Sequence, residues 1–279
     1  MSIAALPYAA FLLFLEFGAG TQLVLLIPQF RARTEISPGF LKMGAMMAIF
    51  GAAIALWIAL SLGVSGDVGG FRLDDRFTGP MRAALAVFTF LCVLYNWFVW
   101  RNDEARGRVL GLLSGAAAAV TLLLAAALVQ LPTWGYIGAL LSLVAGTLAL
   151  GAVSLGMTLG HWYLVTPRLP ERPLNQLTLL LLAALVVQSV IVAANIFIPV
   201  REIPVGPDTP DVSLGQNLWF WLRIGVGLAF PLALAFMAWQ SSVVRAMMSA
   251  TGLLYIAMGS VLAGEVLARA LLFTTARPL

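Results

Sequence analysis

The sequence predicts an all-α membrane protein in which eight transmembrane helices form one bundle over residues 1–279. Of the 279 residues, 61% are hydrophobic and only 10% are charged, a composition far from that of a soluble domain. A helix that spans a bilayer needs about 20 mostly apolar residues, and eight stretches of the chain satisfy this. The connections are short and leave no room for a separate soluble domain.

The eight segments are joined by short connections, several of which contain proline. Their approximate limits are residues 5–29, 40–64, 80–100, 108–130, 135–165, 174–198, 217–240 and 246–274. No basic stretch precedes the first segment, so we expect a retained helix and not a cleaved signal peptide. The connection before the fifth segment contains Pro132 and Trp134 and is so short that the helices on either side must be antiparallel neighbours.

The basic residues in the loops predict the orientation of the bundle. Nine of them lie in the connections on one side, which we expect to be cytoplasmic: Arg31, Arg33, Lys42, Arg101, Arg106, Arg108, Arg168, Arg172 and Arg245. Five lie on the side of the termini: Arg72, Arg76, Arg82, Arg201 and Arg277. Both termini are then outside, and the longer outer loops, 65–79 and 199–216, carry acidic residues that could form a docking surface.

Cysteine and histidine counts exclude several kinds of site. The single cysteine, Cys92, excludes an intrachain disulfide and a cysteine-ligated cluster or zinc site held by this chain alone. The single histidine, His161, excludes bis-histidine haem. His161 follows Gly160 at the end of the fifth segment and is expected to be interfacial, or alternatively a haem ligand together with Met43, Met46 or Met47. The basic residues lie in membrane loops, so we expect no nucleic-acid binding.

Charged residues inside the apolar segments are the candidate functional residues, because a charge at bilayer depth costs about 2.5–3.5 kcal/mol even on insertion scales. Glu265 and Arg269 lie one turn apart in the eighth segment, and Arg223 lies about two turns into the seventh. All three belong to the outer half, so they can form a network. This network is either a structural clamp between helices or the lining of a polar cavity that handles a proton or a redox-active headgroup.

Glu16 lies near the middle of the first segment, and the sequence offers no basic residue at a comparable depth in another segment. It is therefore expected either to carry a proton or to face a wet cavity. As a structural residue it would hydrogen-bond Gln22 or Gln188. As a functional residue it would relay protons.

Four motifs occur in order along the chain: Gly79-Pro80-Met81-Arg82-Ala83, Pro132-Thr133-Trp134, Trp221-Leu222-Arg223, and Gly264-Glu265 followed four residues later by Arg269. Together they resemble the membrane anchor subunits of DMSO-reductase-type molybdenum enzymes and, more distantly, the NrfD and polysulfide reductase anchors. The resemblance implies an eight-helix bundle in a bacterial or archaeal cytoplasmic membrane. It also implies an iron–sulfur subunit and a molybdopterin catalytic subunit docked on the outer face.

The resemblance further implies that menaquinone is bound near that face, while the chain itself holds no haem or iron–sulfur cluster. Glu16, Asp67, Arg223, Glu265 and Arg269 are then the candidate quinone-site residues. Members of the family carry a histidine where this sequence reads 61–67, so Asp67 is the candidate proton acceptor in its place. Two alternatives stay open: a purely structural anchor without quinone chemistry, and a small proton-coupled transporter.

Overall fold

The computed structural model is a bundle of long helices, as the sequence predicts, and it describes residues 5–63, 66–68, 70–131, 134–166, 169–197 and 214–279. Within these ranges, eight helical spans are long and apolar enough to cross a membrane. The helices are α1 (Leu6–Arg31), α2 (Pro38–Ser61), α3 (Thr78–Trp100), α4 (Glu104–Leu128), α5 (Gly135–Val165), α6 (Arg172–Phe197), α7 (Leu218–Ile224), α8 (Phe230–Val243) and α9 (Met247–Thr275). The segment η5 (Gly225–Ala229) joins α7 to α8 in one span.

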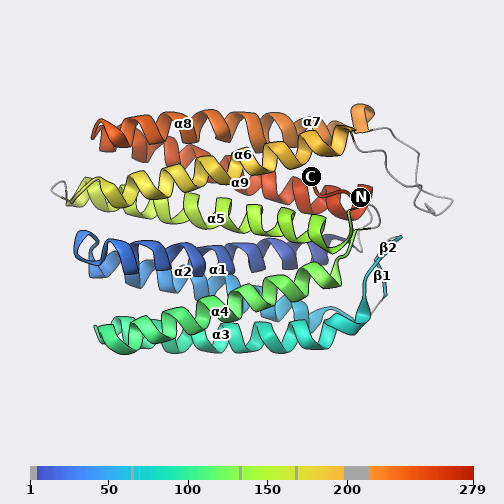
Figure 1. Cartoon of the computed structure of the whole chain (residues 1–279), viewed down its shortest axis with the longest axis horizontal. Helices are drawn as coiled ribbons and strands as arrows, with labels where there is room; N and C mark the ends of the chain where they lie inside the picture. Colours follow the sequence, from blue (N-terminus) through green and yellow to red (C-terminus); the bar gives the residue numbers. More distant parts are fainter. Residues whose placement is uncertain (1–4, 64–65, 69, 132–133, 167–168, 198–213) are drawn as a thin grey trace.

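The start of α1 and the end of α9 lie at the same end of the bundle (Figure 1), which we call the terminal face; the other end is the opposite face. A short hairpin of β1 (Asp67–Val68) and β2 (Phe71–Arg72) lies at the terminal face. Single turns of 3₁₀-helix occur at η2 (Arg33–Glu35), η3 (Asp75–Phe77) and η4 (Leu214–Gln216). The loop 199–216, which was expected to be an acidic docking surface, falls almost entirely outside the described residues.

Helix starts follow capping signals that are visible in the sequence. The Ser37 hydroxyl accepts a hydrogen bond from the Phe40 amide at 3.1 Å, and Pro38 occupies the first turn of α2. The carboxylate of Asp103 likewise accepts from the Arg106 amide at the start of α4. Helix α2 ends at Ser61, a few residues before the limit expected from hydropathy, because the backbone turns extended at Leu62.

Helices α1 and α5 form the centre of the bundle and contact each other directly. Glycines permit this approach: a Cβ atom on Gly20 would lie 2.0 Å from the Thr147 carbonyl oxygen, and one on Gly151 would lie 2.3 Å from the backbone of Gly20. Gly18 of α1 and Gly51 of α2 are packed in the same way. Small residues that let backbones touch are a common basis of helix association in membranes.

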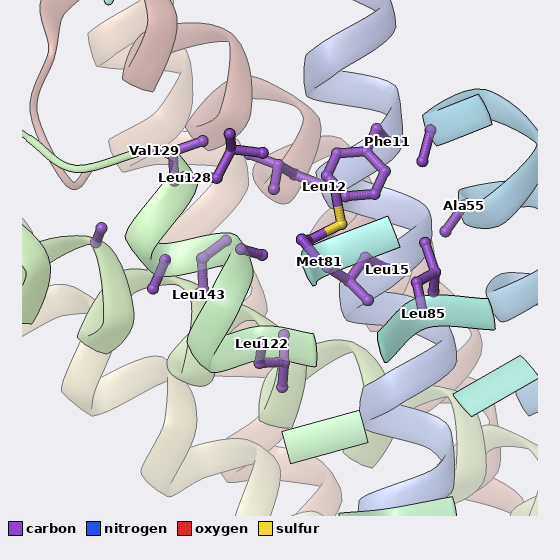
Figure 2. Close-up of a cluster of buried hydrophobic side chains, with 14 of the residues drawn as sticks. Phe11, Leu12, Leu15, Ala55, Met81, Leu85, Leu122, Leu128, Val129 and Leu143 are labelled. Carbon is purple, nitrogen blue, oxygen red and sulfur yellow. The ribbon is translucent and has the colours of Figure 1, made fainter. Parts of the chain in front are cut away.

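Apolar side chains from the first five helices fill the half of the bundle nearest the terminal face. Figure 2 shows Phe11, Leu12 and Leu15 of α1 facing the other helices of this cluster. Their neighbours include Met81 of α3 and Leu143 of α5, both at most 3% exposed. The packing fixes α1 rotationally, which determines where the polar residues of the same helix point.

The span formed by α7 and α8 is interrupted by a π-helical stretch at η5, just before Pro231. Proline has no amide hydrogen, so the carbonyls one turn before it lose their usual donor. The Gly227 oxygen accepts instead from Arg223 Nη1 at 3.3 Å, and the Val226 oxygen accepts from the Ser260 hydroxyl at 2.6 Å. The proline thus creates an acceptor for a buried arginine.

Candidate functional site: a buried charged cluster beside a membrane-facing groove

Four charged side chains gather inside the bundle: Glu16 of α1, Arg223 of α7, and Glu265 and Arg269 of α9. We call them the charged cluster. Each is at most 1% exposed. Glu16 lies ten residues into α1, about 15 Å from its start at roughly 1.5 Å per residue, so the cluster is deep within the span. Charges this deep in a membrane protein must be paired or perform a function.

Arg269 bridges the two carboxylates. Its Nη2 donates to Glu265 Oε2 at 3.2 Å, and its Nε lies 3.3 Å from Glu16 Oε2. The same Nη2 is 3.4 Å from the carbonyl oxygen of Ser142 on α5. One guanidinium group therefore connects α1, α5 and α9.

Arg223 and Gln188 complete the cluster on its other side. Arg223 Nη1 lies 3.6 Å from Glu265 Oε1, and Arg223 Nη2 donates to the side-chain oxygen of Gln188 at 2.8 Å. The amide of Gln188 in turn donates to Glu265 Oε1 at 2.7 Å. The predicted network of Arg223, Glu265 and Arg269 is thus present, and Gln188 ties α6 into it.

Two expectations for Glu16 are wrong. A basic group does lie at the depth of Glu16 in the bundle. The long side chain of Arg269 reaches from α9 across to the Glu16 carboxylate of α1. Gln22 and Gln188 are not its partners: Gln22 donates to the Gly111 carbonyl, and Gln188 is occupied within the cluster. Neither Glu16 oxygen has a hydrogen-bond partner among the described residues, so its contact with Arg269 is electrostatic.

Glycines shape the space around the carboxylates. A Cβ atom on Gly146 of α5 would lie 2.6 Å from Glu265 Oε2 and 2.8 Å from Glu16 Oε1, so both carboxylates border the same small space. On the other side, a Cβ on Gly264 would lie 2.6 Å from the Gly227 backbone and 3.0 Å from Arg223 Nη1. These glycines let α5 and η5 approach α9 closely enough for the charged groups to meet.

The cluster is electrically neutral when both carboxylates and both guanidinium groups are charged. Glu265 has two arginines and an amide donor, whereas Glu16 has one ion-pair contact and unused acceptor capacity. The two carboxylates therefore differ in their surroundings: the oxygens of Glu265 are hydrogen-bonded, and those of Glu16 are not. Among the described residues, no group of three His, Cys, Asp or Glu side chains is placed to hold a metal ion.

A groove of about 410 Å³ lies beside the cluster, on the membrane-facing side of α1 and α9. Its wall is mostly apolar and comes from α1, the start of α7 and α9. The lining residues are Leu6, Ala9, Ala10, Leu13, Asn217, Trp219, Val266, Leu267, Ala270, Leu271 and Thr274. The volume falls in the range of small-molecule sites, roughly 300–1,000 Å³.

None of the four charged side chains lines the groove, but two of its lining residues lie one helical turn from the cluster. Residues three apart stack on one face of a helix, so Leu13 lies over Glu16 on α1, and Val266 lies beside Arg269 on α9. The polar lining residues Asn217 and Thr274 lie near the terminal face, because they stand at the start of α7 and the end of α9. The groove thus extends from a polar rim to about one helical turn from Glu16 and Arg269.

Asp67, the fifth residue expected at the site, lies apart from the cluster. It is exposed in the hairpin, and its Oδ1 accepts from the Gly70 amide at 2.8 Å. The hairpin is attached to the bundle by Phe71, whose ring packs edge-on against Phe273 of α9 with centroids 5.2 Å apart. Beside it, the guanidinium of Arg76 hydrogen-bonds Asp74 and lowers the pKa of that carboxyl below its usual value.

His161 lies at the opposite face, far along α5 from the cluster. It is exposed, and its Nδ1 is 3.4 Å from the hydroxyl of Tyr255. Met43 and Met46 on α2 are also exposed, while the sulfur of Met47 contacts the Thr158 hydroxyl at 3.6 Å. The contacts of His161 and Met47 are those of an interfacial histidine and a packed methionine.

No protein-family model matches this sequence, and no curated protein matches it. The interpretation of the site therefore rests on the geometry of the described residues.

Proposed function

We propose that this protein is the membrane anchor and quinone-binding subunit of a multi-subunit oxidoreductase. It passes electrons between menaquinol and an iron–sulfur subunit docked on the terminal face, with a molybdopterin catalytic subunit beyond. The observation that carries the proposal is the groove between α1 and α9, whose lining residues Leu13 and Val266 lie one helical turn from the ion pair of Glu16 with Arg269. The four ordered sequence motifs that resemble the DMSO-reductase-type anchors support the same assignment.

The groove suits an isoprenoid quinone in three respects. It opens to the bilayer, where such molecules are dissolved, and its wall is apolar apart from a polar rim. Titratable groups, which a quinone headgroup needs for proton exchange, lie one helical turn beyond its lining residues Leu13 and Val266. Small side chains at Ala9, Ala10 and Ala270 create the space, so bulky residues there would close it.

The chemistry requires two protons and two electrons to leave each quinol. The headgroup would enter between Leu13 and Val266 and give one hydroxyl proton to Glu16, whose oxygens have unused acceptor capacity, while the second hydroxyl proton would leave to water at the polar rim of the groove. Arg269 would stabilise the charge that develops on the headgroup oxygen. The electrons would pass to the nearest cluster of the iron–sulfur partner, and reversing each step would describe quinone reduction.

A structural anchor without quinone chemistry is the competing proposal, and one observation favours it. Glu265 is fully enclosed by Arg223, Arg269 and Gln188, as expected of a clamp that fixes α6, α7 and α9 in register. The transporter alternative has less support, because the groove is lined mostly by apolar side chains, which suit a lipid-soluble ligand better than a hydrophilic substrate.

Filling the groove tests quinone binding. We expect Ala10→Trp to abolish binding of the fluorescent quinol analogue 2-heptyl-4-hydroxyquinoline N-oxide, measured by fluorescence quenching with purified protein in nanodiscs. Val190→Trp is the matched control, since Val190 is 62% exposed in the same half of the bundle but on α6, away from the groove. Equal quenching by both variants would place the ligand elsewhere, and no quenching by the unmodified protein would leave the structural anchor as the better proposal.

Copurification tests the partner. If the terminal face docks an iron–sulfur subunit, the protein extracted from its native membrane in mild detergent should bring an iron-containing polypeptide with it. Iron content and mass spectrometry of the purified complex measure this. A protein that purifies alone and without iron under those conditions would contradict both anchor proposals.

A further inference from the structure

Two basic side chains at the opposite face lie on tryptophan rings. Lys42 Nζ, near the start of α2, is 5.2 Å from the centroid of the Trp100 ring at the end of α3. The guanidinium carbon of Arg101, the residue that follows α3, is 4.6 Å from the centroid of the Trp97 ring. We call these four residues the basic aromatic patch. Among the described residues, no carboxylate forms an ion pair with Lys42 or Arg101.

Most other cations at this face are paired. Five arginines there contact a carboxylate: Arg33, Arg106, Arg108, Arg172 and Arg245. Their partners come from the loops of the same face, so these charges are compensated within the protein. The basic aromatic patch, in contrast, has two positive charges that no carboxylate of the described residues balances. The patch is therefore suited to a ligand that brings a negative charge.

The two rings hold the cations on the membrane-facing surface. Trp97 and Trp100 are 55% and 52% exposed, and their spacing of three residues places them on one face of α3. Exposed tryptophan near the end of a spanning helix is typical of the headgroup region. An aromatic face attracts a cation but does not accept hydrogen bonds from its N–H groups as a carboxylate does. Lys42 and Arg101 thus keep N–H donors available for a ligand.

Apolar side chains continue from the patch toward the middle of the membrane. On α3, Val93 and Phe90 follow on the same face as the two rings, and both are exposed. On the neighbouring helix α2, Met46 and Phe50 are exposed as well. Exposed apolar side chains on helices that span a membrane face the acyl chains of lipids. The surface therefore combines cations at headgroup level with an apolar wall below them, as a phospholipid requires.

We propose that the basic aromatic patch binds one anionic phospholipid in the leaflet at the opposite face. The phosphate would lie between Lys42 and Arg101 and accept charge-assisted hydrogen bonds from both. The acyl chains would lie along the exposed apolar residues of α2 and α3. A phosphatidylcholine would bind less well, because its choline group brings a positive charge to a site that already has two. The site is at the other end of the bundle from the polar rim of the groove, so it does not depend on quinone binding.

Native mass spectrometry of the purified full-length protein tests the site. The protein in detergent is titrated with phosphatidylglycerol or with phosphatidylcholine of the same acyl chains, and the dissociation constant of the first bound lipid is determined. We expect the unmodified protein to prefer phosphatidylglycerol by about 25-fold, which is about fivefold for each cation. Lys42→Gln and Arg101→Gln should each lower the preference about fivefold. The double variant should bind the two lipids equally.

Arg31→Gln is the matched control. Arg31 is an exposed cation at the end of α1, at the same face, and among the described residues it has neither a carboxylate nor a ring as a partner. Its removal should leave the lipid preference unchanged. Replacing Trp97 and Trp100 together by leucine keeps both charges but removes the rings that hold them, and should reduce the preference.

Four results would overturn the site. The first is equal affinity of the unmodified protein for the two lipids, and the second is an undiminished preference in the double variant. The third is an equal loss of preference in Arg31→Gln, which would indicate a general effect of net charge. The fourth is displacement of the lipid by soluble glycerol phosphate at the same concentration, which would indicate a site for free anions. Unchanged thermal unfolding temperatures would show that the variants are folded.

Discussion

Replacing Arg269 by leucine is expected to destabilise the protein more than any other single change to the charged cluster, by about 3–5 kcal/mol. Arg269 is the only cation in contact with Glu16 among the described residues, and it also pairs with Glu265. Without it, two carboxylates bordering the same space at Gly146 would repel each other in a medium of low polarity. Thermal unfolding of the purified protein in detergent measures the loss.

The double variant Arg269→Gln with Glu16→Gln is the matched control. It removes one charge of each sign and leaves the Glu265 pair with Arg223 in place. We expect it to recover much of the stability, because no uncompensated charge stays buried. If the double variant unfolds at the same temperature as Arg269→Leu, the pairing between α1 and α9 does not determine the stability of this region.

The second large effect is expected at the contact of α1 with α5. Gly20→Ala would place a Cβ atom 2.0 Å from the Thr147 carbonyl oxygen, and a backbone atom cannot give way as a flexible side chain can. The two central helices must therefore separate, at a cost of about 1–3 kcal/mol or more for overpacking. The same shift would move Gly146 and Thr147 away from Glu16, and we expect a lower unfolding temperature, measured by thermal unfolding of the purified protein in detergent.

Gly259→Ala offers the same substitution without the clash. Gly259 lies on α9, and a Cβ atom there would have nothing within 4 Å. We expect this variant to unfold at the same temperature as the unmodified protein or slightly higher, since alanine favours a helix over glycine by about 0.5–1 kcal/mol. Equal destabilisation by both alanine substitutions would mean that glycine is needed for a reason other than close packing.

The number and order of helices could be predicted from the sequence because a membrane span has a length set by the bilayer and a composition set by its hydrocarbon. The helix N-caps Ser37 and Asp103 are also of residue types that the sequence identifies as favoured helix starts. The helices that neighbour α1 could not be predicted from the sequence, because the surface of α1 is apolar on almost every side. The glycine contacts in the structure show which faces of α1 pack against α2 and α5. The spacing of glycines in the sequence does not indicate which helix packs against them.

Part of the candidate site could be predicted from the positions of charged residues along the apolar segments. Arg223, Glu265 and Arg269 were expected together because all three lie in the same half of the bundle, and they are in contact. The pair of Glu16 with Arg269 was missed because depth was judged from the backbone, whereas an arginine side chain carries its charge several ångströms along the helix. The groove could not be predicted, because it depends on how α1, α7 and α9 pack against one another.

The π-helical stretch at η5 also determines which way Arg223 points. A π-bulge amounts to one residue inserted into an α-helix, and each residue turns the helix by about 100°. Residues before the bulge are therefore rotated relative to those after it, and the side chain of Arg223 faces Glu265 at that rotated angle. The π-bulge before Pro231 thus sets the rotation of the first half of this span, and with it the direction in which the buried Arg223 side chain points.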